Sequence, residues 1–279
     1  MTQMRAAIFQ MTSGVDPARN AAAIVEMVAR AKGEGADMLF TPEMAGCLDR
    51  DRARAAATMR GEADDPVLAA VREAAAREGL WVHLGSLPLK GERADGRLAN
   101  RSFLIDGSGE IRARYDKIHL FDVDLATGES WRESSVYGPG ERVVAADTPW
   151  GRMGFSICYD MRFPDLYRAL TNAGATIVLA PAAFTVPTGR AHWHVLLRAR
   201  AIEAGCFVIA AAQSGAHEDG RTTYGHSLVV DPWGEVLLDM GEGEGLGLAD
   251  LDLARIEDVR SRVPAIANRR PIPEDVTIP

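Results

Sequence analysis

The sequence is poor in cysteine, and this scarcity excludes several classes of protein. Its 279 residues contain three cysteines, Cys47, Cys158 and Cys206, which are odd in number and far apart. Such a set does not build a disulfide framework and is typical of a reducing compartment, so we expect a cytoplasmic protein. No two cysteines form a C-x-x-C pair, which is the usual signal of a structural zinc site. We therefore expect neither a metal nor another cofactor.

The sequence also lacks an excess of positive charge. The formal net charge is −8 and the isoelectric point is about 5.3. A phosphate backbone selects clustered lysine and arginine, so nucleic acid is not an expected partner. No apolar run is long enough to span a bilayer, and residues 1–11 resemble a first strand more than a secretion signal. We expect no association with a membrane.

The same order of predicted elements occurs twice along the chain, with little sequence identity between the two copies. Each copy contains an opening strand, a short apolar strand between Gly-Ala and Pro, an alanine-rich helix that ends at a glycine, and a hairpin. Gly79 and Gly205 stand where a left-handed helix C-cap is expected. The matching segments are 4–10 with 152–158, 35–42 with 174–181, 72–84 with 198–210, and 102–111 with 227–236.

The repeat predicts an α/β fold made of two β-α-β-α-β-β-β halves. The first helix is expected to have Asp16 as its N-cap and Pro17 at its first position, and to run to Lys32. Two sheets covered by helices can bury their bare faces against each other. We expect a four-layer α-β-β-α sandwich with an internal pseudo-twofold, formed by residues 1–279 as one domain. The tail, from about 264 to 279, is expected to lie extended on the body or on a partner subunit.

Three reactive side chains follow the ends of predicted strands. Glu43 comes after the apolar residues MLF, Lys117 ends the returning strand of the first hairpin, and Cys158 ends the strand that opens the second half. In α/β sheets the reactive groups gather beyond the carboxyl ends of the strands. The sequence therefore predicts that a carboxylate, an amine and a thiol meet at one site.

These three groups suit a hydrolase. The thiolate is the nucleophilic form of cysteine, the Lys117 ammonium favours it, and the Glu43 carboxylate can accept the proton as a general base. Lys117 and the backbone N–H of Tyr159 can then stabilise an oxyanion. Each side chain also has a structural interpretation, in which Cys158 is a small core residue, Glu43 a loop charge and Lys117 an edge-strand lysine.

Histidine offers a second hydrolase hypothesis, in which Cys158 works with His192, His194 or His226. The pair His192 and His194 also looks like a metal motif. It precedes a helical run, however, and alternate residues of a helix lie on different sides. We therefore expect His192 and His194 to be structural or rim residues.

Three motifs resemble the signatures of the nitrilase superfamily of carbon–nitrogen hydrolases. They are TPEM around Glu43, YDKIHLFD around Lys117 and GFSICYDMRFPDL around Cys158, and the resemblance extends over nearly the whole chain. It implies an α-β-β-α sandwich that forms a homodimer or a larger homo-oligomer. It also implies that Glu43 is the base, Lys117 the oxyanion stabiliser and Cys158 the nucleophile. A further family glutamate matches Glu133 in WRES, with Glu129 in TGES as its competitor.

The residues after the cysteine indicate a branch of the superfamily. Nitrile-cleaving members typically have Trp-Glu there, whereas this chain has Tyr159 and Asp160. The longer pattern resembles the branch of deaminated glutathione amidase and omega-amidase, and the QSG and RTTYGHS segments look closer to the former. The resemblance implies an amidase that forms a thioester and releases 2-oxoglutarate and cysteinylglycine. The alternatives are an omega-amidase acting on 2-oxoglutaramate or 2-oxosuccinamate, and a non-catalytic scaffold on the same fold.

A small amide substrate of this kind carries carboxylates, which a cationic group must recognise. An arginine fork suits a carboxylate best, and Arg162, just after the nucleophile, is a candidate. Arg162 can equally pair with Asp160 or Asp165 and serve the fold. The other residues expected in the substrate pocket are Tyr159, Phe184 and Thr185.

Overall fold

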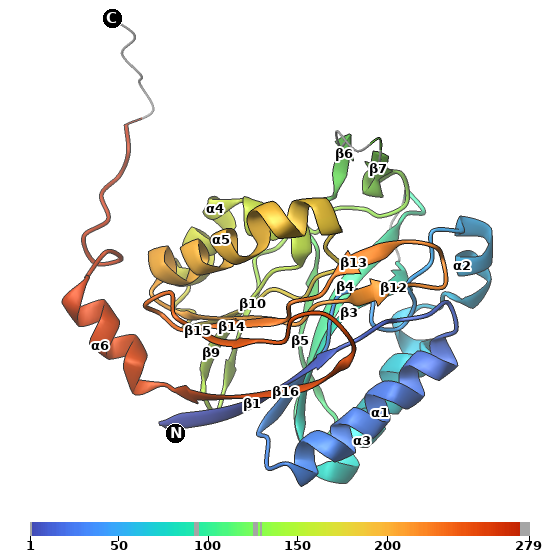
Figure 1. Cartoon of the computed structure of the whole chain (residues 1–279), viewed down its shortest axis with the longest axis horizontal. Helices are drawn as coiled ribbons and strands as arrows, with labels where there is room; N and C mark the ends of the chain where they lie inside the picture. Colours follow the sequence, from blue (N-terminus) through green and yellow to red (C-terminus); the bar gives the residue numbers. More distant parts are fainter. Residues whose placement is uncertain (1, 92–94, 125–127, 129, 274–279) are drawn as a thin grey trace, which may run out of the picture.

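Two six-stranded sheets form the centre of the molecule (Figure 1). The computed structural model describes residues 2–91, 95–124, 128 and 130–273. The first sheet has the order β16-β1-β2-β3-β4-β5 and the second the order β15-β14-β11-β10-β9-β8. The strands of the first sheet are β1 (Gln3–Gln10), β2 (Met38–Phe40), β3 (Trp81–Lys90), β4 (Leu98–Ile105), β5 (Ile111–Asp116) and β16 (Gly245–Asp252). Those of the second are β8 (Ala145–Thr148), β9 (Gly151–Phe155), β10 (Ile177–Leu179), β11 (Phe207–Ala210), β14 (Leu228–Val230) and β15 (Val236–Asp239).

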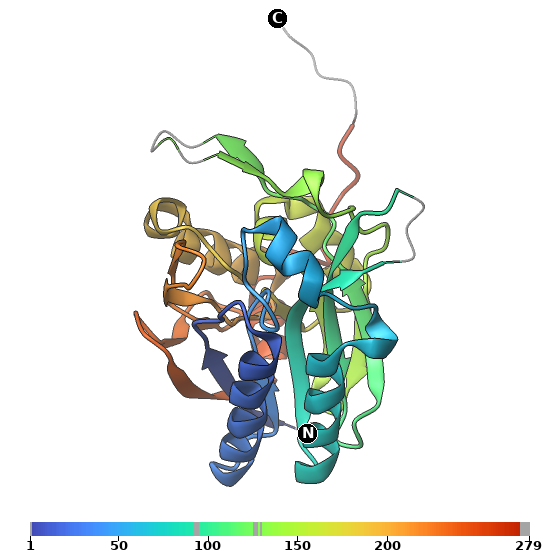
Figure 2. The same cartoon turned by 90° about the vertical axis from the view of Figure 1, so that its right-hand side faces the viewer.

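Helices cover the outer face of each sheet. Helices α1 (Pro17–Gly33) and α3 (Pro66–Glu78) lie side by side on the first sheet, and α4 (Pro164–Asn172) and α5 (Val186–Ala204) cover the second (Figures 1 and 2). No helix in the described part of the chain combines the length and the apolar character that a membrane span requires.

Side-chain alternation along the strands explains why the layers hold together. Along β1, Ala7 and Phe9 pack in the cluster with α1 and α3, whereas Ala6 and Ile8 belong to the cluster that contains Phe155 of the second sheet. Successive side chains of a strand point to opposite faces, so each strand of the first sheet serves two apolar interfaces. The predicted four-layer α-β-β-α sandwich is confirmed.

The two predicted halves are also confirmed. The first runs β1-α1-β2-α3-β3-β4-β5 and the second β9-α4-β10-α5-β11-β14-β15. Asp16 caps α1 by accepting a hydrogen bond from the Ala18 N–H, and Gly79 and Gly205 have φ values of +61° and +51° at the ends of α3 and α5. Helix α1 extends one residue further than expected and includes Gly33.

Several elements lie outside the predicted repeat. Strand β16 leaves the second half and pairs antiparallel with β1, so the end of the chain completes the first sheet. Strand β8 adds an edge to the second sheet. The remaining elements are α2 (Arg52–Thr58), α6 (Ala254–Arg262), the hairpins β6 (Asp122–Asp124)–β7 (Ser130–Arg132) and β12 (Ser214–Ala216)–β13 (Thr222–Tyr224), and the short 3-10 helices η1 (Glu62–Asp64), η2 (Glu133–Ser135) and η3 (Cys158–Arg162).

Two expected boundaries are corrected. Strand β9 ends at Phe155, so Cys158 does not end the strand but begins η3, because the chain leaves the sheet at that point. Strand β5 ends one residue before Lys117. In the tail, 264–273 contain no helix or strand and extend away from the sheets (Figure 1), although Arg269 donates to Asn172 at the end of α4. Residues 274–279 of the expected extended tail lie outside the described residues.

Candidate active site

A cavity of about 700 Å³ lies where the loops after β2, β5 and β9 converge. All four predicted catalytic residues, Glu43, Lys117, Glu133 and Cys158, line this cavity. The residues predicted for the substrate pocket line it too, with one exception: Arg162 is absent from the described lining. Those that line it are Tyr159, Phe184 and Thr185. The structure therefore brings together seven of the eight predicted site residues.

The loop that carries Glu43 is fastened to β3. The Met44 N–H donates to Ser86 Oγ at 2.9 Å, and Met44 adopts a left-handed φ of +56°. At Gly85 a Cβ atom would lie 2.1 Å from the carbonyl oxygen of Thr41. Only glycine permits this close approach of the two backbones. The sharp turn after β2 thus fixes where the Glu43 carboxylate points.

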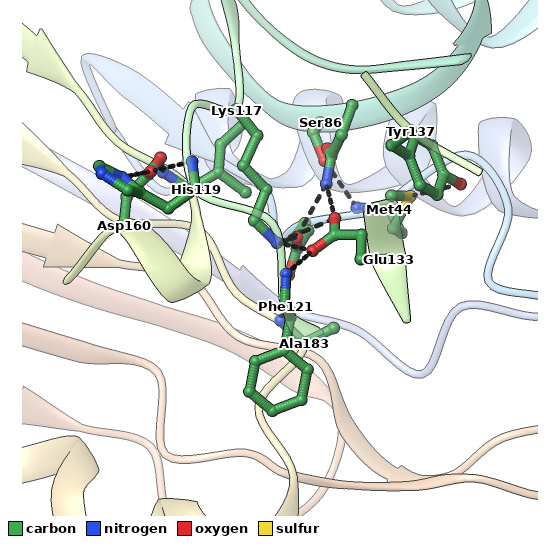
Figure 3. A network of polar contacts seen from close by, with 12 residues as sticks. Met44, Ser86, Lys117, His119, Phe121, Glu133, Tyr137, Asp160 and Ala183 are labelled. Atoms are coloured by element: carbon green, nitrogen blue, oxygen red, sulfur yellow. Dashed lines mark hydrogen bonds and ion pairs between the residues drawn. The ribbon is translucent and has the colours of Figure 1, made fainter. Parts of the chain in front are cut away.

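Lys117 lies between two carboxylates. Its Nζ is 2.9 Å from Glu43 Oε1 and 2.8 Å from Glu133 Oε2, and the Asn100 side-chain amide donates to Glu43 Oε1 at 2.9 Å. The Phe121 N–H holds Glu133 Oε2 at 2.6 Å, as Figure 3 shows. Burial opposes the charge on Lys117, yet Glu133 and Glu43 together raise its pKa well above the usual value. The amine therefore stays protonated although its side chain is almost fully buried.

Cys158 is held in a strained conformation beside this network. Its φ is +49°, and its backbone N–H donates to the Pro181 carbonyl at 2.9 Å. Burial raises the pKa of the Cys158 thiol well above its usual value, the Glu43 charge raises it further, and Lys117 offsets only part of the rise. The expectation that Lys117 favours the thiolate has the correct sign, but it is too weak to decide the resting state. The group is a neutral thiol that needs a base.

Glu43 has the contacts that such a base requires. One carboxylate oxygen accepts from Lys117 and Asn100, while the other accepts from the Ala183 N–H at 2.9 Å. The Glu43 charge is close enough to the Cys158 thiol to raise its pKa, and both side chains line the same cavity. A carboxylate beside a thiol can serve as the base that accepts its proton.

Asp160 ties the cysteine loop to the lysine segment. It is fully buried and accepts from the Tyr115 hydroxyl at 2.7 Å, the His119 N–H at 2.9 Å and the Ile157 N–H at 2.9 Å. Tyr115 and His119 flank Lys117, whereas Asp160 itself lies two residues after Cys158. The sequence pointed to Asp160 as a branch marker and as a partner for Arg162, but not to this positioning contact.

Arg162 sits behind the cavity wall. Its guanidinium lies 5.8 Å from the ring centre of Tyr159 and 5.4 Å from that of Phe184, and its Nη1 is 3.3 Å from His192 Nδ1. Asp165, which the sequence suggested as an ionic partner, instead pairs with Arg168. Arg162 therefore supports two pocket-lining rings, and its predicted contact with a substrate carboxylate stays a prediction.

Several cavity residues were not predicted from the sequence. The guanidinium groups of Arg50 and Arg221 lie 5.8 Å and 5.2 Å from the ring centre of Trp131. Arg50 and Arg221 come from loops and Trp131 from the short strand β7, all outside the repeat, where no periodic pattern points to them. Asn100, which contacts Glu43 from outside the described lining, had one signal, since it is a buried amide within the apolar strand β4. Glu129, the competitor of Glu133, lies outside the described residues.

The remaining histidines and cysteines do not support the rival hydrolase. His194 and His226 both pair with Asp239, and neither they nor His192 belong to the described cavity lining. Cys47 does line the cavity, but burial raises the pKa of its thiol to about 11. Cys47 is therefore protonated at neutral pH.

Comparison with known proteins identifies relatives that match nearly the whole chain. The deaminated glutathione amidase of Yersinia enterocolitica is 39% identical over 275 residues, which cover 97% of this chain and 94% of that protein. The crystal structure of the C. elegans NitFhit protein has a TM-score of 0.89 and 38% identity, and the match covers 97% of this chain and 66% of that one.

A third relative is informative about the cysteine. In a glutamate-to-glutamine mutant of the amidase from Nesterenkonia sp. AN1, acrylamide has added to the active-site cysteine. That structure has a TM-score of 0.78 and 30% identity, and the match covers 94% of this chain and 98% of that one. The family model for carbon-nitrogen hydrolases matches residues 5–261. This chain therefore belongs to the carbon–nitrogen hydrolase family, within the nitrilase superfamily.

Proposed function

We propose that this chain is an amidase that hydrolyses deaminated glutathione to 2-oxoglutarate and cysteinylglycine through a thioester on Cys158. The observation that carries the proposal is that Glu43, Lys117 and Cys158 line one cavity, in which the Glu43 carboxylate accepts a hydrogen bond from the Lys117 ammonium. The names of relatives that match nearly the whole chain support the choice of substrate.

Acylation needs one proton to move twice. Glu43 accepts the thiol proton as the Cys158 sulfur attacks the amide carbonyl carbon. The Lys117 ammonium and the Tyr159 N–H stabilise the oxyanion of the tetrahedral intermediate. When the carbon–nitrogen bond breaks, protonated Glu43 delivers its proton to the leaving amine, and a thioester remains on Cys158.

Deacylation uses the same groups. Glu43, again a carboxylate, takes a proton from a water molecule, whose oxygen attacks the thioester carbon. The carbon–sulfur bond then breaks, the carboxylic acid leaves, and the proton on Glu43 returns to the sulfur. Glu133 and Asn100 do not exchange protons in this scheme; they hold Lys117 and Glu43 in place through the hydrogen bonds described above.

The charge of the cavity lining favours an anionic substrate. The formal net charge of the chain is −8, yet the lining is rich in cationic side chains. A cationic cleft on an acidic protein concentrates anions and speeds their association. Deaminated glutathione carries a carboxylate at each end, which suits this distribution. The cationic lining residues outside the catalytic network are Arg50, Arg52, Lys90, Arg132 and Arg221.

A side-by-side rate comparison tests the choice of substrate. We expect kcat/KM for deaminated glutathione to exceed that for 2-oxoglutaramate by at least about tenfold, because the longer substrate reaches more of the cationic lining. Steady-state rates with both amides would measure the ratio. An equal or reversed ratio would favour the omega-amidase alternative, and a protein that hydrolyses neither amide and forms no adduct on Cys158 would favour the non-catalytic scaffold.

We further infer that the protein is a homodimer, joined through α5 and the β14–β15 hairpin. Val195 is 68% exposed and Ile202 52% exposed on α5, and Trp233 of the hairpin is 54% exposed. The two elements are contiguous, since Arg198 donates to the Gly234 carbonyl. Exposed apolar side chains that gather in one patch are typical of an interface.

Light scattering measures the oligomeric state directly. We expect a mass near twice the 30.1 kDa of the chain for the wild type, and a monomer for Ile202→Glu. A control substitution at an exposed position on another face, Glu26→Gln on α1, should leave the dimer intact. A wild-type protein that is monomeric at micromolar concentration would refute the proposed interface. The cytoplasmic location stays a prediction.

A further inference from the structure

A cluster of two histidines and an aspartate lies outside the cavity. His194 lies on α5, His226 lies two residues before β14, and Asp239 is the last residue of β15. His194 Nε2 is 2.9 Å from Asp239 Oδ2, and His226 Nδ1 is 2.9 Å from Asp239 Oδ1. One ligand atom from each of the three lies within 4.8 Å of the others. We propose that His194, His226 and Asp239 form a binding site for a divalent metal ion of the zinc type.

The ligand set suits this class of ion. Imidazole nitrogen and carboxylate oxygen are the usual ligands of Zn²⁺, and three protein ligands with a water molecule complete a tetrahedron. Ligands about 2.0–2.2 Å from the ion in that geometry lie roughly 3.3 Å apart. The two histidines contact different oxygens of Asp239, and the three ligand atoms lie within 4.8 Å of one another. Binding therefore requires the side chains to approach a common centre by up to about 1.5 Å. The three side chains are 22–34% exposed in the single chain, so an ion from solution can reach them there. In the proposed dimer the cluster lies at or beside the interface, because α5 and β15 belong to both.

The backbone at His226 is strained, and its conformation is fixed from both sides. Among the described residues, the non-glycine residues with positive φ are Met44, Cys158 and His226. The first two shape the candidate active site, whereas His226, with φ of +55°, lies at the cluster. Its N–H donates to the Gly241 carbonyl at 2.7 Å, and its carbonyl accepts from Trp193 Nε1 at 2.8 Å. Strain held in this way is common where a side chain must be presented to a ligand.

The surroundings hold the ligands in orientation. The His226 ring stacks on Tyr224, with ring centres 4.5 Å apart, and the Gly241 N–H donates to Asp239 Oδ1 at 2.9 Å. Such contacts from outside the ligand set fix the direction of a metal ligand. Binding requires a lone pair on His194 Nε2 and on His226 Nδ1. Neutral rings then carry their protons on the other ring nitrogen, and a protonated ring releases one proton to solvent.

The cluster is separate from the catalytic network. None of its three residues belongs to the described lining of the cavity. An ion there would connect α5 to the end of β15 and to the turn before β14, three segments that approach one another on the second sheet (Figure 1). A ligand that binds the folded state alone stabilises it by mass action. We therefore expect the ion to raise the thermal stability of the fold.

Zinc titration of the full-length protein tests this site. Calorimetry of the metal-free wild type with Zn²⁺ should show one ion per chain bound here, and the unfolding temperature should rise by several degrees as Zn²⁺ is added. His194→Gln and Asp239→Asn should each weaken binding by at least about tenfold, because each removes one of three protein ligands. His192→Gln is the matched control: it removes an exposed histidine two residues away on the same helix and should bind like the wild type.

Two further measurements keep the outcome unambiguous. Titration with Co²⁺ should give spectra of nitrogen and oxygen ligands without a thiolate band, and Cys158→Ala should retain the site, which excludes binding at the catalytic thiol. If one variant fails to fold, the other still tests the site. Equal Zn²⁺ affinity of the wild type and the folded variants, or no Zn²⁺ binding by the wild type at micromolar concentration, would reduce the cluster to a hydrogen-bonded structural element.

Discussion

Replacing Cys158 with serine is expected to lower kcat/KM for amide hydrolysis on the order of 10⁴-fold or more, because losing a catalytic nucleophile removes the covalent path. A hydroxyl is a far weaker acid than a thiol, so the Glu43 carboxylate cannot generate the attacking anion. The serine side chain fits the same space, and the backbone bond from the residue 158 N–H to Pro181 is kept. The loss would therefore report on chemistry more than on folding.

Initial rates measure the loss, and mass spectrometry of the protein quenched during turnover identifies the reason. The wild type should carry an acyl group on Cys158, and the Cys158→Ser protein should carry none. Cys206→Ser is the matched control, because Cys206 is fully buried next to β11 and does not line the cavity. More than about one hundredth of the wild-type rate in Cys158→Ser would mean that another group is the nucleophile.

The elements that were predicted correctly are those whose signal is local. The strands β2 and β10 are three buried residues each, bounded by Gly-Ala before and Pro after, and the helix ends at Gly79 and Gly205 need a left-handed residue. Strand β16 lacks such a signal. The glycines at its start are typical of a loop. The segment nevertheless forms a strand, because β1, near the other end of the chain, supplies its hydrogen-bond partners.

The same distinction separates the predicted site residues from those that were missed. Glu43, Lys117 and Cys158 follow strands, so a rule about strand ends locates them. Asp160 and Asn100 act through partners that are 41 and 57 positions away in the sequence, His119 and Glu43, respectively. Only the folded chain reveals such contacts. The protonation state of Cys158 is another example, since it depends on how deeply the thiol is buried.

Replacing Glu43 with glutamine is expected to slow amide hydrolysis and, at the same time, to speed the alkylation of Cys158. Hydrolysis should fall by roughly 10²–10⁴-fold, the usual contribution of a general base. The pKa of the Cys158 thiol should fall as well, because the Glu43 charge is one of the groups that raise it while Lys117 lowers it. Each unit of decrease makes the thiolate about tenfold more abundant at a pH below the pKa. Alkylation of Cys158 by iodoacetamide at neutral pH should therefore become faster.

A slower hydrolysis together with a faster alkylation distinguishes two roles of Glu43: a general base, or a charge that only neutralises Lys117. If Glu43 served only to neutralise the ammonium, a more abundant thiolate in Glu43→Gln would leave acylation as fast as in the wild type or faster. A base that must also protonate the leaving amine and activate water predicts instead that a more reactive sulfur accompanies a slower enzyme. The pH dependence of alkylation and the steady-state rate, measured on Glu43→Gln and on Glu26→Gln from the exposed face of α1, separate the two cases. Faster alkylation together with near wild-type hydrolysis would remove Glu43 from the proton path.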